Sequence, residues 1–221
     1  MLTEHARFAL GAGLARRYPA DVIPFAGVAD PTPEAATALA GLMASGEDIY
    51  VLDPFPSANR DLLEIGELPC WQMIFDRAGG PLPTIEPSRT AAVRALGKAD
   101  VPAMVALTDR AFPGFFRART FELGRYYGIH VDGVLVAMAG QRLALPGCRE
   151  LSAVCTHPEH TGRGYAALLV NQLLQLHAAA GLCSFLHVAA VNARAIALYE
   201  RAGFAKTREI VFRRLKRRYE P

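Results

Sequence analysis

The chain has 221 residues, enough for one large domain or two small ones. Hydrophobic residues make up 52% of it and charged residues 20%, as in ordinary globular proteins, and the formal net charge of +3 is too small to indicate a nucleic-acid partner. The sequence has no signal-peptide pattern, no apolar run that could span a bilayer, and no cysteine spacing typical of a zinc site or a disulfide framework, so a cytoplasmic protein without a metal is expected.

The first third of the chain combines predicted helices and strands but contains no catalytic motif. Residues 4–18 and 33–45 are rich in alanine and leucine and are predicted to be helical. Residues 48–52 and 71–75 are predicted to be short strands, because Pro54 and the pair Gly79-Gly80 bound them. This part is therefore predicted to be a small α+β region.

A segment rich in proline and glycine follows this region. Residues 79–89 contain three prolines and two glycines, a density that breaks both helices and strands. We place the main boundary there, which divides the chain into an N-terminal region of residues 1–85 and a second domain of residues 90–221.

Strands and helices alternate in the second domain. The predicted strands are residues 91–96, 126–131, 134–143, 150–156, 183–189 and 204–215, and the predicted helices are residues 100–112, 115–123, 164–179 and 192–202. The strands at 126–131 and 134–143 form a hairpin around Asp132-Gly133, a strong turn dipeptide. This order predicts an α/β fold with a mixed sheet and helices on its faces.

Glycines recur at alternate positions where the predicted strand at 150–156 leads into the helix at 164–179. Gly162 and Gly164 let the backbone approach an anion without a Cβ in the way, and Arg163 adds a positive charge. The free N–H groups and the dipole at the start of the helix also favour an anion such as a diphosphate. The spacing matches neither a Walker loop nor the dinucleotide-binding fingerprint, so these residues alone leave open a structural turn without a ligand.

A second motif, residues 192–204, follows about thirty residues later. Ile196, Tyr199 and Gly203 fall on related faces of one predicted helix. Taken singly, Asn192 could be a helix cap and Tyr199 a core side chain. Their occurrence downstream of the glycine loop favours a functional role.

Together the two motifs resemble those of the GNAT superfamily of N-acetyltransferases, over about residues 90–215. The family's phosphate loop reads Arg/Gln-x-x-Gly-x-Gly/Ala, and residues 161–166 here read Thr-Gly-Arg-Gly-Tyr-Ala, so only Thr161 departs from it. The later family motif, Asn-x-x-Ala-x-x-Leu-Tyr-Glu-x-x-Gly-Phe, matches residues 192–204 closely. The resemblance implies a mostly antiparallel GNAT-type sheet in which the parallel strands 150–156 and 183–189 splay apart.

Within the superfamily, residues 153–158 and the Gly-Arg-Gly-Tyr-Ala run are most similar to the branch related to glycine N-acyltransferases. In that branch an N-terminal extension that resembles a degenerate second copy of the fold is common. Residues 1–85 are a candidate for such a GNAT-like half.

The resemblance also implies roles for residues around acetyl-CoA. The loop backbone is expected to hold the CoA diphosphate, and the backbone of residues 154–156 to pair with the pantetheine arm. One of those N–H groups is expected to polarise the thioester carbonyl. Asn192 is expected to contact the arm, and Tyr199 to protonate the leaving thiolate as a general acid. The expected cofactor-binding residues are Val154, Cys155, Thr156, Thr161, Gly162, Arg163, Gly164, Tyr165, Ala166, Asn192 and Tyr199.

The first candidate for the general base is Glu150. It lies eleven positions before Thr161, the offset of the catalytic glutamate in histone-acetylating members of the family. The alternative for Glu150 is a strand-edge ion pair with Arg149 or Arg142.

Other polar residues are weaker candidates for the chemistry. His157 is a rival base, because an unperturbed histidine titrates near neutrality. Glu122 and Asp109 lie in predicted helices that wall the acceptor site in the family, so either could bind the substrate amine. Cys155 lacks a visible histidine partner, which argues against covalent catalysis.

These observations predict an acetyl-CoA-dependent N-acetyltransferase that acts on a small amine or amino acid, without nucleic-acid or membrane partners, as a monomer or homodimer. Tyr199 and Glu150 argue against a catalytically inactive CoA-binding sensor, which would not need a thiolate acid. Acetylation of proteins or peptides stays open, because acceptor specificity lies in the helices near residues 100–123 and in the N-terminal part. The basic residues 213–218 are expected to form a solvated end of the chain.

Overall fold

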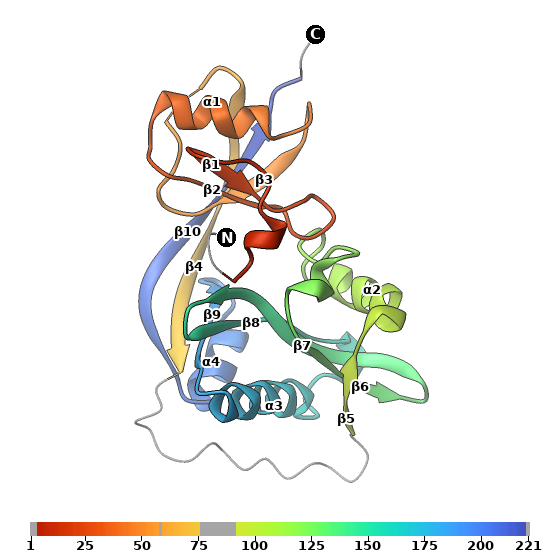
Figure 1. The fold of residues 1–221 in the computed structure, drawn as a ribbon. Coiled ribbons are helices and arrows are strands. Elements are labelled where there is room, and N and C mark those ends of the chain that lie inside the picture. The colour runs from red at the N-terminus through yellow and green to blue at the C-terminus, as the bar shows by residue number, and fades with distance from the viewer. Residues whose placement is uncertain (1–3, 58, 76–91, 220–221) are drawn as a thin grey trace.

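The computed structural model describes residues 4–57, 59–75 and 92–219, and these residues build one ten-stranded sheet (Figure 1). The strand order is β1-β2-β3-β10-β4-β9-β8-β7-β6-β5. The strands are β1 Ala15–Arg17, β2 Phe25–Val28, β3 Asp48–Val51, β4 Leu62–Phe75, β5 Val93–Leu96, β6 Tyr126–Val131, β7 Val134–Leu145, β8 Cys148–Thr156, β9 Cys183–Ala189 and β10 Phe204–Arg217. Among the described strands, the parallel pairs are β2–β3 and β8–β9.

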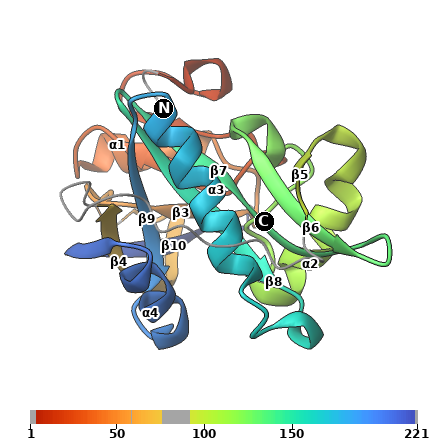
Figure 2. The same cartoon turned by 90° about the horizontal axis from the view of Figure 1, so that it is seen from below.

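Helices cover both faces of the main sheet. The α-helices are α1 Pro33–Gly41, α2 Val101–Ala111, α3 Tyr165–Ala179 and α4 Ala193–Arg201. Figure 2 shows α3 lying across one face, where Leu169 and Leu173 share a core with Ile196 of α4. Met104 and Leu107 of α2 pack with Met138 of β7 in a separate core on the opposite face.

Two long strands, β4 and β10, connect β1, β2 and β3 to the other strands of the sheet. β10 pairs with β3 near its C-terminal end and with β4 along its whole length, and β4 also pairs with β9 (Figure 1). The expected boundary at 79–89 lies outside the described residues. The division of the chain into two regions stays a prediction, but β4, which precedes that boundary, is a central strand of the same sheet.

The predicted fold class is confirmed: the sheet is mixed and mostly antiparallel, with helices on its faces. The hairpin of β6 and β7 turns at Asp132 and Gly133, whose φ angles of 50° and 79° suit a type I′ turn. The predicted helices at 33–45, 100–112, 164–179 and 192–202 and the predicted strands at 183–189 and 204–215 are all present within a few residues.

Two predicted helices are wrong. Residues 4–18 form only a 3₁₀ turn, Ala6–Phe8, and then β1, because Gly11 and Gly13 take left-handed backbone angles that a helix cannot contain. Residues 115–123 contain only the 3₁₀ turn η4, Thr120–Leu123, in which the Thr120 hydroxyl donates to the carbonyl of Val22. A contact between segments distant in sequence therefore replaces local helix formation there.

Strand lengths were also underestimated. The predicted strand at 71–75 is only the end of β4, and β2 was not predicted. The outer half of β4 is largely exposed, so it lacks the apolar alternation that marks a half-buried strand. This half of β4 is a strand because it pairs with β10, a contact that the local sequence does not indicate.

Gly140 of β7 offers a test of this packing. A Cβ at this position would overlap the ring of Tyr126 on β6, whereas a Cβ at Gly66 of β4 would meet open space. We expect Gly140→Ala to lower the free energy of unfolding by about 1–3 kcal/mol through overpacking. Chemical denaturation should show no such loss for the control Gly66→Ala, and equal stability of the two variants would contradict the described register of β6 and β7.

Candidate active site

The parallel strands β8 and β9 separate halfway along their length. Their pairing runs from Cys148 opposite Cys183 to Leu151 opposite Leu186 and ends there, although β8 continues to Thr156. Ala153 has a φ of 53°, and the register of β8 against β7 shifts at this point, so a bulge turns β8 away from its neighbour. A gap therefore opens between the two strands beyond Leu151.

A glycine loop lies beyond the end of β8 and leads into α3. Gly162 and Gly164 have φ angles of +79° and +78°, and a Cβ on either would meet open space. In the part of the chain that the structure describes, no side chain caps the start of α3 at Gly164, so the first-turn N–H groups remain available to an anion. The hydroxyl of Thr161 donates to the carbonyl of Pro158 at 3.0 Å, so the residue that departs from the family motif is engaged within its own turn.

The loop, the end of β8 and α4 line a groove of about 550 Å³. All eleven residues expected to bind the cofactor lie along it. Two arginines of α4 that no sequence motif singled out, Arg194 and Arg201, line the same groove. Their spacing of seven places both on one face of the helix, a periodicity that could have identified them.

A second cavity, of about 350 Å³, lies beside this groove, and we call it the aromatic cavity because several phenylalanine and tyrosine side chains line it. Ala111 and Phe112 from the end of α2 line both cavities, as do Val154, Asn192, Ala195 and Tyr199. The remaining aromatic residues of the second cavity are Phe25, Phe115, Phe116, Tyr126 and Phe212. The groove and the aromatic cavity therefore meet at the gap between β8 and β9.

Tyr199 lies where the two cavities meet. Its side chain is buried, and burial raises the pKa of its phenol well above the usual value. Among the described residues its hydroxyl has no hydrogen-bond partner, so the proton is both retained and accessible to a ligand. Asn192, at the same junction, caps α4 by accepting a hydrogen bond from the N–H of Ala195 at 3.0 Å.

Glu150 lines neither cavity and instead forms a buried ion pair with Arg142. Its oxygens accept hydrogen bonds from Nε and Nη2 of Arg142 at 2.9 and 2.5 Å, from the N–H of Leu143 at 3.1 Å and from Nδ1 of His187 at 2.7 Å. Burial alone would raise the pKa of Glu150, but the Arg142 charge and the bonds from Arg142 and His187 lower it to about 2.

This geometry favours the ion-pair alternative for Glu150 over the role of general base. The side chain has no exposed surface, and all four hydrogen bonds go to protein groups. A carboxylate with a pKa of about 2 is also a weak proton acceptor.

The other candidates for acid–base chemistry lie outside the two cavities. His157 accepts a hydrogen bond from the N–H of Glu159 at 3.4 Å in the turn before the glycine loop. Glu122 is paired with Arg119, and Asp109 accepts from the N–H of Gly114 at 3.4 Å. None of the three lines the aromatic cavity.

Cys155 lies on β8 beside the gap, but its chemistry does not suit a nucleophile. Burial raises the pKa of its thiol to about 12, so the thiolate is scarce at neutral pH. This agrees with the prediction that Cys155 does not form a covalent intermediate.

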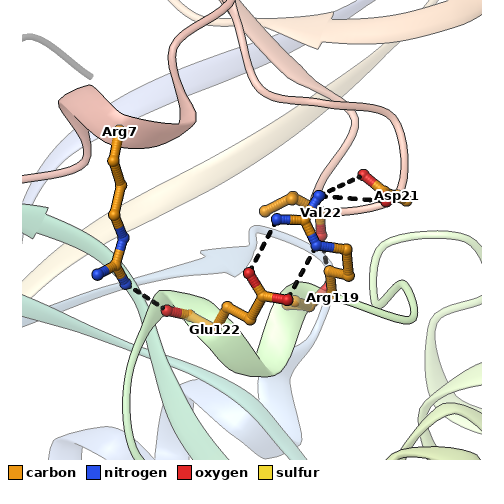
Figure 3. Close-up of polar contacts among 6 residues, drawn as sticks. Arg7, Asp21, Val22, Arg119 and Glu122 are labelled. Atoms are coloured by element: carbon orange, nitrogen blue, oxygen red, sulfur yellow. Dashed lines mark hydrogen bonds and ion pairs between the residues drawn. The ribbon is translucent and has the colours of Figure 1, made fainter.

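The N-terminal region forms part of the wall of the aromatic cavity. Phe25 lies on β2, and its ring contacts those of Phe115 and Phe212 at centroid distances of 6.2 and 5.5 Å. Figure 3 shows Arg119 between Asp21 and Glu122, with Arg7 donating to the Glu122 carbonyl at 3.1 Å. These contacts fix η4, which contributes Thr120 to the cavity.

Comparison with known proteins identifies the family. The family model described as FR47-like protein matches residues 126–213. A structure from Novosphingobium aromaticivorans that bears the name of an acetyltransferase from the GNAT family is 36% identical, covers 96% of this chain and 92% of its own, and superposes with a TM-score of 0.85. The chain belongs to the GNAT family of acetyltransferases, and the similarity extends over the N-terminal region as well.

More distant structures share the fold. A GCN5-related N-acetyltransferase from Kribbella flavida is 18% identical over 98% of this chain and 92% of its own, with a TM-score of 0.67. A GCN5-related N-acetyltransferase-like protein from Streptococcus suis is 12% identical over 94% of this chain and 85% of its own, with a TM-score of 0.59. No curated protein matches the chain. Within the described ranges, no helix is both long and apolar enough to cross a bilayer.

The buried pair of Glu150 and Arg142 can be tested through stability. Glu150→Gln leaves the Arg142 charge buried without a counter-ion, so we expect the free energy of unfolding to fall by about 3–5 kcal/mol. The control is Glu64→Gln, the matched change at an exposed glutamate of β4. Urea denaturation should show its free energy of unfolding falling by less than about 1 kcal/mol.

The pair also predicts a dependence on pH. Because the folded-state pKa of Glu150 is about 2, below its unfolded value of 4.5, its contribution is complete above pH 4.5 and is lost as the pH falls towards 2. The Glu150→Gln variant should lack this component. If its stability fell with acid as steeply as that of the wild type, the low pKa of Glu150 would be disproved.

Proposed function

We propose that the chain is an acetyl-CoA-dependent N-acetyltransferase that transfers the acetyl group directly from CoA to a primary amine of a small molecule. One observation carries this proposal: an anion-binding groove and an aromatic cavity meet at Tyr199, in the gap between β8 and β9. Such a junction suits a reaction between a phosphate-bearing donor and a smaller acceptor that enter from different sides.

The residues of the groove fit CoA. The open backbone at Gly162 and Gly164 suits a diphosphate, and Arg163, Arg194 and Arg201 supply positive charge for it and for the further phosphate of CoA. Thr161 is not required, since the backbone donates the hydrogen bonds. The end of β8, residues 154–156, lies along the same groove and suits an extended arm with amide groups.

When bound, acetyl-CoA supplies an acetyl thioester, an acyl group that an uncharged amine can accept. Tyr199 donates its phenolic proton to the departing sulfur, because its raised pKa keeps the phenol protonated and no described residue bonds its hydroxyl. The phenolate then takes the proton that the attacking nitrogen loses as the amide forms, which restores Tyr199. One of the backbone N–H groups of residues 154–156 polarises the carbonyl oxygen. Cys155 stays a protonated thiol throughout.

The acceptor amine sheds its proton before it reaches the site. Among the described residues, the titratable side chains that line the aromatic cavity are Cys70, Tyr126, Arg142, His187 and Tyr199, and no carboxylate is included. His187 uses Nδ1 towards Glu150 and Nε2 towards Gln72, at 2.7 and 3.1 Å. No free base therefore lines this part of the site, and the rate should follow the ionisation of the amine itself.

Size and chemistry favour a small acceptor over a protein. A cavity of about 350 Å³, walled by the N-terminal region and η4, suits one small molecule. An inactive CoA sensor is disfavoured because Tyr199 is a buried phenol at the reacting junction that no described residue hydrogen-bonds. We also propose that the chain belongs to the glycine N-acyltransferase-like branch of the family, because residues 153–158 and the loop that follows resemble that branch.

A screen of amines that measures release of free CoA tests the proposal. We expect turnover with at least one small primary amine and an acetylated product detected by mass spectrometry. Tight binding of acetyl-CoA without turnover on any amine would indicate the sensor instead, and turnover on peptides alone would indicate a protein acetyltransferase.

Removing the proposed acid should separate chemistry from binding. In Tyr199→Phe the hydroxyl is lost but the ring remains, so we expect kcat to fall about 100-fold while acetyl-CoA affinity changes little. Tyr127→Phe, at a partly buried tyrosine that lines neither cavity, is the control. An unchanged kcat in Tyr199→Phe would remove Tyr199 as the acid.

The glycine loop can be tested by CoA binding alone. Gly164→Glu places a negative side chain in the groove, so calorimetry should show CoA affinity lowered at least tenfold. Gly181 is a matched control, because it follows the other end of α3, has a φ of +68° and lies outside the groove. Equal CoA affinity of Gly164→Glu and Gly181→Glu would place the phosphates elsewhere.

A further inference from the structure

Arg142 of β7 presents a cation to the aromatic cavity. Two of its three guanidinium nitrogens, Nε and Nη2, bind Glu150. The third, Nη1, has no hydrogen-bond partner among the described residues. The side chain keeps 14% of its surface exposed and lines the cavity.

The position of this guanidinium is fixed by its neighbours. Glu150 is itself held by the Leu143 N–H and by His187, so it cannot follow a moving arginine. The ring of Phe25 lies over the guanidinium carbon at 4.8 Å and restrains it from another side. The unused N–H groups of Nη1 are therefore preorganised for a ligand in the cavity.

The surroundings determine which ligand group these donors suit. The wall is largely apolar, with the ring of Phe25 over Arg142 and the rings of Phe115 and Phe212 packed against Phe25. The described residues that line it include no carboxylate. A carboxylate on the ligand would gain a charge-assisted hydrogen bond beside a largely apolar wall. A second cation at this position would be repelled.

We infer that the acceptor is an amino acid with an apolar or aromatic side chain. Its carboxylate binds Nη1 of Arg142, its side chain packs on the phenylalanine rings, and its amino group lies towards Val154 and Tyr199. This inference rests on the proposed acetyltransferase function and gives Arg142 the role of selecting the acceptor. Phe25 extends that role to the N-terminal region, since β2 supplies one wall of the side-chain pocket.

Three matched amines test the inference on the wild-type protein: L-phenylalanine, L-phenylalaninamide and phenethylamine. Each kcat/KM is calculated for the uncharged amine, so differences in amine basicity do not enter. We expect phenylalanine to exceed each of the other two at least tenfold. If phenethylamine or the amide were acetylated as well as phenylalanine, the carboxylate site would be disproved while the acetyltransferase function held. If neither these three compounds nor any amine of the wider screen were acetylated, the proposed function itself would fail.

A binding measurement separates the carboxylate site from turnover. By calorimetry, 3-phenylpropionate should bind the wild-type protein at least tenfold more tightly than 3-phenylpropanamide, which has the same shape without the charge. Equal affinities would overturn the inference whether or not the protein transfers acetyl groups.

Arg142→Lys assigns the effect to this residue. Lysine keeps the positive charge beside Glu150 but lacks the planar fork that serves Glu150 and a ligand together. The preference for 3-phenylpropionate over its amide should fall at least tenfold in Arg142→Lys and remain unchanged in Arg60→Gln, at an exposed arginine outside both cavities. Thermal unfolding establishes that each variant is folded. A folded Arg142→Lys with the wild-type preference would exclude Arg142, and the wild-type comparison decides the question if this variant does not fold.

Discussion

The site depends on one buried ion pair at the place where two parallel strands separate. Glu150 of β8 binds Arg142 of β7 on one side and His187 of β9 on the other, so a single carboxylate connects three adjacent strands. The last pair of β8 and β9 is Leu151 with Leu186, immediately after this connection. The network therefore holds the strands together up to the point from which they must diverge, and it compensates for the pairing that the gap removes.

The elements around the gap form the groove on one side of it and the aromatic cavity on the other. The bulge at Ala153 turns β8 away, which leaves room beside residues 154–156 and brings the start of α3 to the far end of the groove. On the other side, the aromatic cavity draws walls from α2, η4, β4 and the N-terminal β2. The contacts of Arg119 with Asp21 and Glu122 link the segment before β2 to η4, so the N-terminal region contributes to the wall of the acceptor cavity.

The sequence predicts those features of the fold and site whose signals are local in the chain. The glycine loop, the motif at 192–204 and the Asp132-Gly133 hairpin are contiguous, and each has a direct backbone reason, so they were located correctly. The helix predicted at 4–18 failed because Gly11 and Gly13 outweighed its alanines, and that at 115–123 failed because Thr120 bonds Val22, about a hundred residues away. The cavity itself could not be predicted, since Phe25, Arg142 and Phe212 meet only through the sheet order.

The environment of Glu150 decides between two uses of one carboxylate. A general base needs a pKa near the working pH and access to the substrate, whereas a buried counter-ion needs a low pKa and complete hydrogen bonding. Glu150 has the second set of properties. Its charge offsets that of Arg142, which lowers the cost of burying the arginine in an aromatic cavity and leaves one guanidinium nitrogen for a ligand. A base at position 150 would require a free carboxylate there, and the arginine would then lose the partner that holds it in place.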